Sequence, residues 1–204
     1  IFNCPDHAEY LQRASRPSGM DAVNSFIQEN RFITFQAHNA MAAGGFIFNA
    51  LPEARMVHIC RHPVDQIYKW FERGWGEREI EDPLSFVPTT ESPAGTVPWF
   101  ANNWAEKYAA ATPMVRALEG VLFLQNADEN GFQALSEHQS RQVHRISLEH
   151  LVTNPDDVVR GISSFLQSEP HELMESMLLE ERIPRVLDLE DRQQMFQKIA
   201  SFAT

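Results

Sequence analysis

The chain has 204 residues, of which 43% are hydrophobic and 22% charged, a size and composition typical of one globular domain with a full core. Its formal charge of −11 argues against non-specific nucleic-acid binding, which depends on a basic field that displaces counterions from phosphates. The sequence contains no run of about 18 apolar residues, so it predicts no membrane span. The eight histidines show no spacing typical of a metal site, so we expect none.

The two cysteines are Cys4 and Cys60, which are too few for a disulfide framework. Cys60 lies inside an apolar run, and we expect it to be a buried free thiol. This cysteine usage favours a reducing, cytoplasmic setting.

Hydrophobic periodicity and helix-terminal residues predict the elements of the first half of the chain. In order, these are a helix at 19–31, a strand at 31–36, a short helix or turn at 39–51, a strand at 54–60 and a helix at 63–76. The strand at 54–60 is almost continuously apolar, as buried parallel strands are. Residues 81–99 are rich in Pro, Gly, Ser and Thr, which predicts a long, lid-like loop.

The same signals continue through the second half. They predict helices at 98–112, 132–142, 154–167, 169–182 and 188–202, and strands at 120–125 and from 143 onward. The helix at 154–167 has Asn154 as its cap and Pro155 in its first turn. Because strands alternate with helices, we expect an α/β fold, in which a three-layer, mainly parallel sheet is flanked by helices within one domain over 1–204.

Arg61 follows the apolar strand at 54–60 and stands two residues before Pro63, where a helix begins. In open parallel sheets, ligands collect beyond the carboxyl ends of the strands, and helix N-termini there attract anions. Arg61 is therefore a candidate anion ligand. The alternative is that Arg61 pairs with Asp65, four residues later, and only anchors the turn; the residues alone leave both interpretations open.

Three stretches resemble sulfotransferases that use 3′-phosphoadenosine 5′-phosphosulfate. "LPEARMVHICRHPVDQIYKW" (51–70) is similar to the part of that family in which an apolar strand runs into Arg-x-Pro-x-Asp and a helix. "RISLEHLVTNPDDVVRGISSFLQ" (145–167) is similar to a second stretch, and "FITFQAH" (32–38) resembles the strand that ends in a catalytic His. The resemblance covers about residues 31–167 and implies a P-loop-type nucleotide-transferase fold.

The resemblance also implies roles for individual residues. Arg61 would bind the 3′-phosphate, and His38 would be the general base that deprotonates a hydroxyl on a small or carrier-bound acceptor, without a metal. Lys69 stands where the family has a second phosphate ligand, a Ser, and is a candidate for that role. The alternatives are a His38 that bonds backbone at a strand end and a Lys69 that is solvated on a helix flank.

Residues 1–30 show nothing similar to the family's first strand and phosphate loop, which we expect to have been lost by trimming. Two other functions remain open: another nucleotide-dependent transferase, such as a kinase, and a non-catalytic binding module on the same fold. Glu149 likewise has two interpretations, a catalytic carboxylate or a residue that fixes the turn after a strand. The acceptor and the oligomeric state cannot be predicted.

Overall fold

The computed structural model describes residues 8, 24, 28, 33–77 and 87–202. The chain divides into two compact units, Ile1–His38 and Asn39–Thr204, which we describe separately. That both belong to one domain over 1–204 stays a prediction. Within the described ranges, no helix is long and apolar enough to cross a membrane.

The first unit is described mainly at its end. The helix expected at 19–31 falls almost entirely outside the described residues, as do 31 and 32 of the strand expected at 31–36. Residues 33–36 have no regular secondary structure, so for them the strand prediction is wrong. Ile33 and Phe35 are 65% and 80% exposed, so the apolar side chains that suggested a strand are not packed as in a sheet.

The second unit opens as the sequence predicts. A 3-10 turn, η1 (Ala40–Ala43), leads into helix α3 (Gly44–Ala50), and strand β1 (Met56–Cys60) leads into helix α4 (Pro63–Glu72). Pro63 occupies the first turn of α4, where its fixed φ angle suits a helix and its missing N–H costs nothing.

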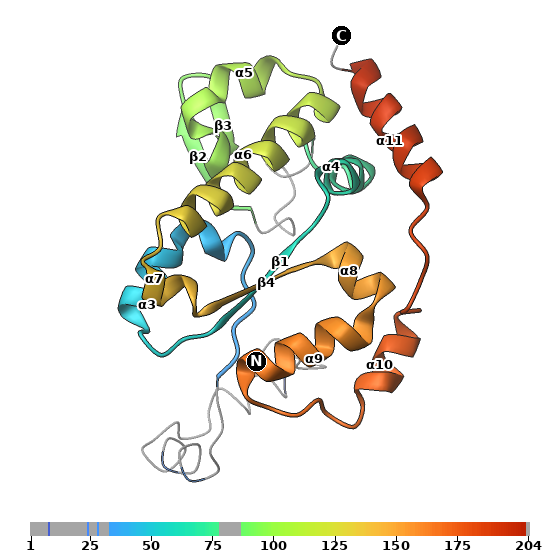
Figure 1. The fold of residues 1–204 in the computed structure, drawn as a ribbon. Helices are drawn as coiled ribbons and strands as arrows, with labels where there is room; N and C mark the ends of the chain where they lie inside the picture. Colours follow the sequence, from blue (N-terminus) through green and yellow to red (C-terminus); the bar gives the residue numbers. More distant parts are fainter. Residues whose placement is uncertain (1–7, 9–23, 25–27, 29–32, 78–86, 203–204) are drawn as a thin grey trace. The chain divides into compact units, whose positions relative to one another are not determined.

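Strand β4 (Val143–Ser147) pairs with β1 in parallel, with Met56 opposite Val143 and Cys60 opposite Ser147. Figure 1 shows the two strands side by side, with helices on both sides of the pair. The predicted α/β class is therefore confirmed, as is the parallel pairing of strands. Among the described residues, the parallel sheet is small, with two strands.

The prediction of a loop over 81–99 is wrong for its described part. Strands β2 (Thr89–Ser92) and β3 (Gly95–Pro98) form an antiparallel hairpin, while residues 81–86 lie outside the description. The turn is closed by the Ser92 hydroxyl, which donates a hydrogen bond to the Gly95 carbonyl over 2.7 Å. Gly95 has a φ of 102°, a conformation that favours glycine.

After the hairpin, the helix expected at 98–112 appears as a 3-10 helix, η3 (Trp99–Trp104), and an α-helix, α5 (Ala105–Ala110). The strand expected at 120–125 is wrong, because these residues lie inside α6 (Pro113–Gln133). Val121 and Leu124, three positions apart, are buried, whereas Leu122 is 40% exposed. This is the periodicity of a helix face, which a short apolar run does not reveal.

The remaining elements are helical apart from β4. Helix α7 (Glu137–Ser140) covers part of the helix expected at 132–142, whose first two residues belong to α6. The others are α8 (Leu148–Thr153), α9 (Pro155–Leu166), α10 (Met174–Glu180) and α11 (Leu189–Phe202). Helix α9 begins at Pro155 and ends within one residue of the predicted boundary.

Two clusters of buried side chains form core regions among the described residues of the second unit. One joins the hairpin to α5 and α6 and contains Val97, Phe100, Ala101, Ala105, Tyr108 and Leu124. The other joins α4, α6 and α11 and contains Ile67, Met114, Val121 and Ile199. Trp70 of α4 packs against both clusters. Helix α4 is therefore fixed between α6 and α11, and this fixes the residues at its N-terminus.

Candidate functional site at the carboxyl ends of the parallel strands

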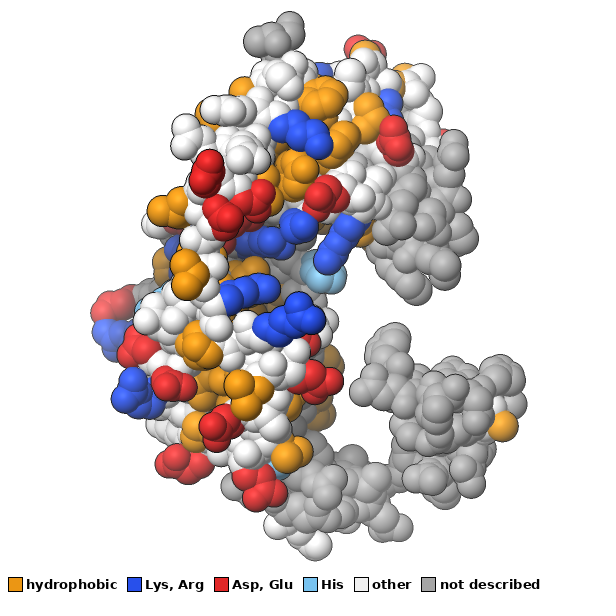
Figure 2. Space-filling model, turned by 90° about the vertical axis from the view of Figure 1, so that its right-hand side faces the viewer, with side chains coloured by type: hydrophobic (Ala, Val, Ile, Leu, Met, Phe, Trp, Pro, Cys, Tyr) orange, Lys and Arg blue, Asp and Glu red, His pale blue; other side chains and the backbone are white. Residues whose placement is uncertain are grey.

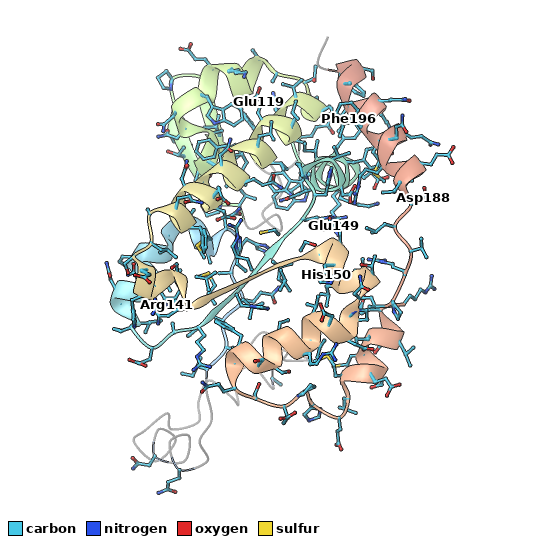
Figure 3. The ribbon with its side chains drawn as sticks, in the orientation of Figure 1. Glu119, Arg141, Glu149, His150, Asp188 and Phe196 are labelled. Carbon is cyan, nitrogen blue, oxygen red and sulfur yellow. The ribbon has the colours of Figure 1, made fainter. Side chains whose placement is uncertain are left out.

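The segments that follow β1 and β4 meet at one edge of the parallel pair, because the strands run together up to Cys60 and Ser147. Arg61 and His62 connect β1 to α4, and α8 starts directly after β4 with Glu149 in its first turn. Figure 3 shows Glu149 on α8, beyond the ends of the strands. The segments around Arg61 and Glu149, both singled out in the sequence, thus converge here.

Glu149 joins the two segments. Its Oε1 accepts a hydrogen bond from the backbone N–H of His62 over 2.8 Å. His62 is the residue before α4, and no side chain of its own caps the helix. Glu149 thus holds the turn after β1, whereas the sequence interpretation had it fixing the turn after its own strand.

Gln125 of α6 holds the same turn from the other direction. Its side-chain amide donates to the Arg61 carbonyl over 3.1 Å and to Oε1 of Gln66 over 2.9 Å. The backbone at Arg61 and His62 is therefore held by a carboxylate from α8 and an amide from α6. Such a turn presents its side chains in a fixed direction.

Asp65 pairs with Arg192 of α11 and not with Arg61. The Arg192 guanidinium binds both carboxylate oxygens, with Nε 2.9 Å from Oδ1 and Nη2 2.6 Å from Oδ2. Nη2 also lies 4.0 Å from Oε1 of Glu149. The side chains of the pair are about one-fifth exposed. Asp65 raises the pKa of Arg192, so the cation is firmly charged.

This pairing overturns the interpretation of Arg61 as the partner of Asp65. The Arg61 side chain is partly buried, and it has no hydrogen bond or ion pair to any described residue. Figure 2 shows Lys and Arg side chains gathered across the middle of the face that carries α10 and α11. Several cations of a net negative chain thus gather there, with Asp and Glu side chains around them.

Lys69 lies two turns further along α4. Its Nζ is 2.6 Å from Oε2 of Glu72, and the two side chains are 43% and 41% exposed. Lys69 is therefore in a surface ion pair on the flank of the helix, six residues or about 9 Å along the axis from Pro63. In its described contacts it does not join Arg61.

His38 is the last residue of the first unit, in an exposed-to-intermediate turn at the end of the irregular segment. Arg61 belongs to the second unit. The expected juxtaposition of His38 with Arg61 therefore stays a prediction, as does its role as a base.

Sequence reasoning missed two groups of residues. Arg192 stands in "EDRQQM", where no pattern distinguishes it from a solvated helix residue. His58 and Cys60 lie two apart on β1, a spacing that puts them on one face of a strand and that was available as a signal. Cys60 is free, as expected, but it is partly rather than fully buried. No three metal-ligating side chains of the described part cluster as a metal site would require.

A separate open groove of about 620 Å³ runs between β4 and helices α8 and α9. It is lined by both charged signs, including Arg145, His150, Arg160 and Asp157. Asp157 lies 3.5 Å from His150 and 3.7 Å from Arg160, so the Arg160 guanidinium already has a carboxylate partner. None of the residues predicted from the sequence lines this groove.

Comparisons with protein-family models, with curated proteins and with solved structures found no match.

Proposed function

We propose that this chain is a sulfotransferase that moves a sulfuryl group from 3′-phosphoadenosine 5′-phosphosulfate to a hydroxyl of a small or carrier-bound acceptor, on a three-layer, P-loop-type fold. The observation that carries the proposal is Arg61. It stands at the carboxyl end of a parallel strand and the start of a helix, and no described residue pairs with its guanidinium.

The surroundings of Arg61 favour a phosphate. Helix α4 has ten residues, and the side chain of its N-cap residue, His62, does not cap it, so the first turn adds a positive partial charge beside the guanidinium. A guanidinium offers a planar pair of donors that matches two phosphate oxygens. Gln125 and Glu149 hold the backbone on both sides, which reduces the entropy lost on binding.

Arg192 supports the same role by neutralising Asp65. An unpaired carboxylate in the first turn of α4 would repel a phosphate from this helix end. The two-point ion pair with Arg192 cancels most of that field. The turn can therefore hold an anion although a carboxylate lies four residues after Arg61.

In the proposed reaction, the acceptor oxygen attacks sulfur while the bond from sulfur to the 5′-phosphate oxygen breaks. His38 takes the acceptor proton, and 3′-phosphoadenosine 5′-phosphate leaves with the bonding electron pair. Lys69 would bind the nucleotide after its ion pair with Glu72 breaks. An exposed pair of this kind contributes about 1 kcal/mol or less, so a phosphate can replace it.

The test is a calorimetric titration of the full-length protein with 3′-phosphoadenosine 5′-phosphate. We expect Arg61→Ala to weaken binding by at least about 30-fold, since a desolvated charge pair to phosphate is lost. Arg141→Ala is the matched control and should bind as the wild type does, because Arg141 stands directly after α7 with a side chain that is 74% exposed. Adenosine 5′-phosphosulfate, which lacks the 3′-phosphate, should bind equally weakly to the wild type and to Arg61→Ala.

Two other results would redirect the function. Loss of binding in Arg160→Ala with retention in Arg61→Ala would place the nucleotide in the groove beside α9 and refute the Arg61 site. Tight nucleotide binding without transfer to any hydroxyl acceptor would support a binding module instead of an enzyme. For His38, the expected result is that His38→Ala keeps nucleotide affinity and loses turnover.

A further inference from the structure

Cys60, His58 and Asp128 form a thiol–imidazole–carboxylate series across β1 and α6. His58 Nδ1 lies 3.8 Å from the Cys60 sulfur, and His58 Nε2 lies 3.7 Å from Oδ2 of Asp128. The imidazole thus stands between an acid on one side and a thiol on the other. This is the order in which a carboxylate orients a histidine toward a nucleophile.

Asp128 is held in position by the chain at η1. Its Oδ1 accepts a hydrogen bond from the Ala42 N–H over 2.9 Å, and its Oδ2 accepts one from the Asn39 side-chain amide over 3.4 Å. The side chains of Asp128 and His58 are each 15% exposed. The imidazole–carboxylate pair is therefore shielded from water and fixed by the contact between α6 and η1.

A second cation faces the same sulfur. Arg145 of β4 stands opposite His58 in the strand register, and its Nη2 lies 3.9 Å from the Cys60 sulfur. The same nitrogen is 2.8 Å from Oε2 of Glu129, and the guanidinium packs over the ring of Phe132. The thiol is thus placed between an imidazole and a guanidinium.

This placement shifts the pKa values of His58 and Cys60 in opposite directions. Asp128 first, and Cys60 second, raise the pKa of His58 to about 9. His58 first, together with Arg145, lowers the pKa of Cys60 against the opposing effect of burial. Glu129, the remaining charged group beside Arg145, is half-buried, and it pairs with the same Arg145 nitrogen that faces the sulfur. Both shifts favour a cationic imidazolium beside an anionic sulfur.

We propose that Cys60 is a reactive thiolate, positioned by His58, Asp128 and Arg145, and that it is a site of modification by low-molecular-weight disulfides. The thiolate attacks one sulfur of the disulfide, a new sulfur–sulfur bond forms at Cys60, and the other half leaves as a thiolate that takes a proton from water. Cys60 is partly exposed, which gives the disulfide access. The proposal does not depend on nucleotide binding.

The test uses a Cys4→Ser protein, in which Cys60 is the remaining cysteine. Thiolate absorbance and the rate of reaction with 5,5′-dithiobis(2-nitrobenzoate) are measured from pH 4 to 10, and the mixed disulfide formed with oxidised glutathione is identified by mass spectrometry. We expect an apparent thiol pKa below the ordinary value of about 8.5. His58→Gln should return it toward that value and slow the reaction at pH 7 by at least about tenfold.

Two further variants keep the result interpretable. Asp128→Asn keeps an oxygen for the Ala42 N–H and removes the charge, so it should raise the thiol pKa even if His58→Gln folds poorly. His144→Gln is the matched control, because His144 stacks on Phe165 and makes no contact with Cys60. A thiol pKa near 8.5 that none of these variants changes, or a Cys60 that no disulfide modifies in the folded protein, would overturn the proposal.

Discussion

The sharpest structural prediction concerns Gly131, where α6 crosses η1. A Cβ at this position would lie 2.1 Å from the Met41 carbonyl oxygen and 2.9 Å from the Ala42 Cα. Both obstacles are backbone atoms, so no side chain can rotate away. Gly131→Ala must therefore push η1 away from α6.

The cost of that movement can be worked out from what η1 contributes. Met41 is fully buried, and exposing part of it costs about 2 kcal/mol. Loss of the hydrogen bond from the Ala42 N–H to Asp128 costs about 1.5 kcal/mol more. Replacing a helical glycine by alanine returns about 1 kcal/mol. We therefore expect the free energy of unfolding to fall by about 2–3 kcal/mol in Gly131→Ala.

Urea denaturation followed by circular dichroism measures this change. Gly45→Ala in α3 is the control, because a Cβ there meets nothing within 4 Å, and it should be neutral or stabilising by up to about 1 kcal/mol. If Gly131→Ala were as stable as Gly45→Ala, α6 and η1 could not approach as closely as the structure shows. The placement of Asp128 beside His58 would then also be in doubt.

Two further predictions concern charged pairs. Arg192→Met removes the two-point ion pair with Asp65. Because both side chains are partly exposed, we expect the free energy of unfolding to fall by about 1–2 kcal/mol, measured by urea denaturation. An unchanged denaturation midpoint would contradict the pairing. The second concerns pH. The raised pKa of His58 contributes stability that is complete below its unfolded value of about 6.5 and is lost as pH rises through about 9. The lowered pKa of Cys60 contributes stability that is present above its unfolded value and lost as pH falls, so in the wild type it opposes the trend from His58. Cys60→Ala should therefore lose stability as pH rises above 6.5, and a level profile in that variant would show that His58 carries no raised pKa.

Elements with strong terminal signals were predictable. Helices α4 and α9 begin at Pro63 and Pro155 as predicted, because proline suits a first helical turn in any tertiary setting. Strand β1 was predictable because a short, nearly continuous apolar run followed by a helix start is typical of parallel sheets.

The errors have a common physical cause. The run at 120–125 is apolar enough for a buried strand, but it lies in a 21-residue helix, and only packing against α4 and the hairpin shows which of its side chains are buried. The Pro-containing stretch at 89–98 is a hairpin. Its composition suggested a loop because its strands are short and its turn residues are those that loops also use. In both places local composition suits two structures, and tertiary contacts select one.

The sequence by itself determined the position of Arg61, because a residue between an apolar strand and a helix start must lie at a carboxyl edge of the sheet. It could not determine which cation pairs with Asp65, since Arg192 is 127 positions away and is brought there only when α11 packs on α4. The same holds for Cys60: the alternation of β1 puts it on one face with His58, but only the packing of α6 brings Asp128 to that face. Local spacing sets which side chains share an element, whereas long-range packing decides their partners and so their charge.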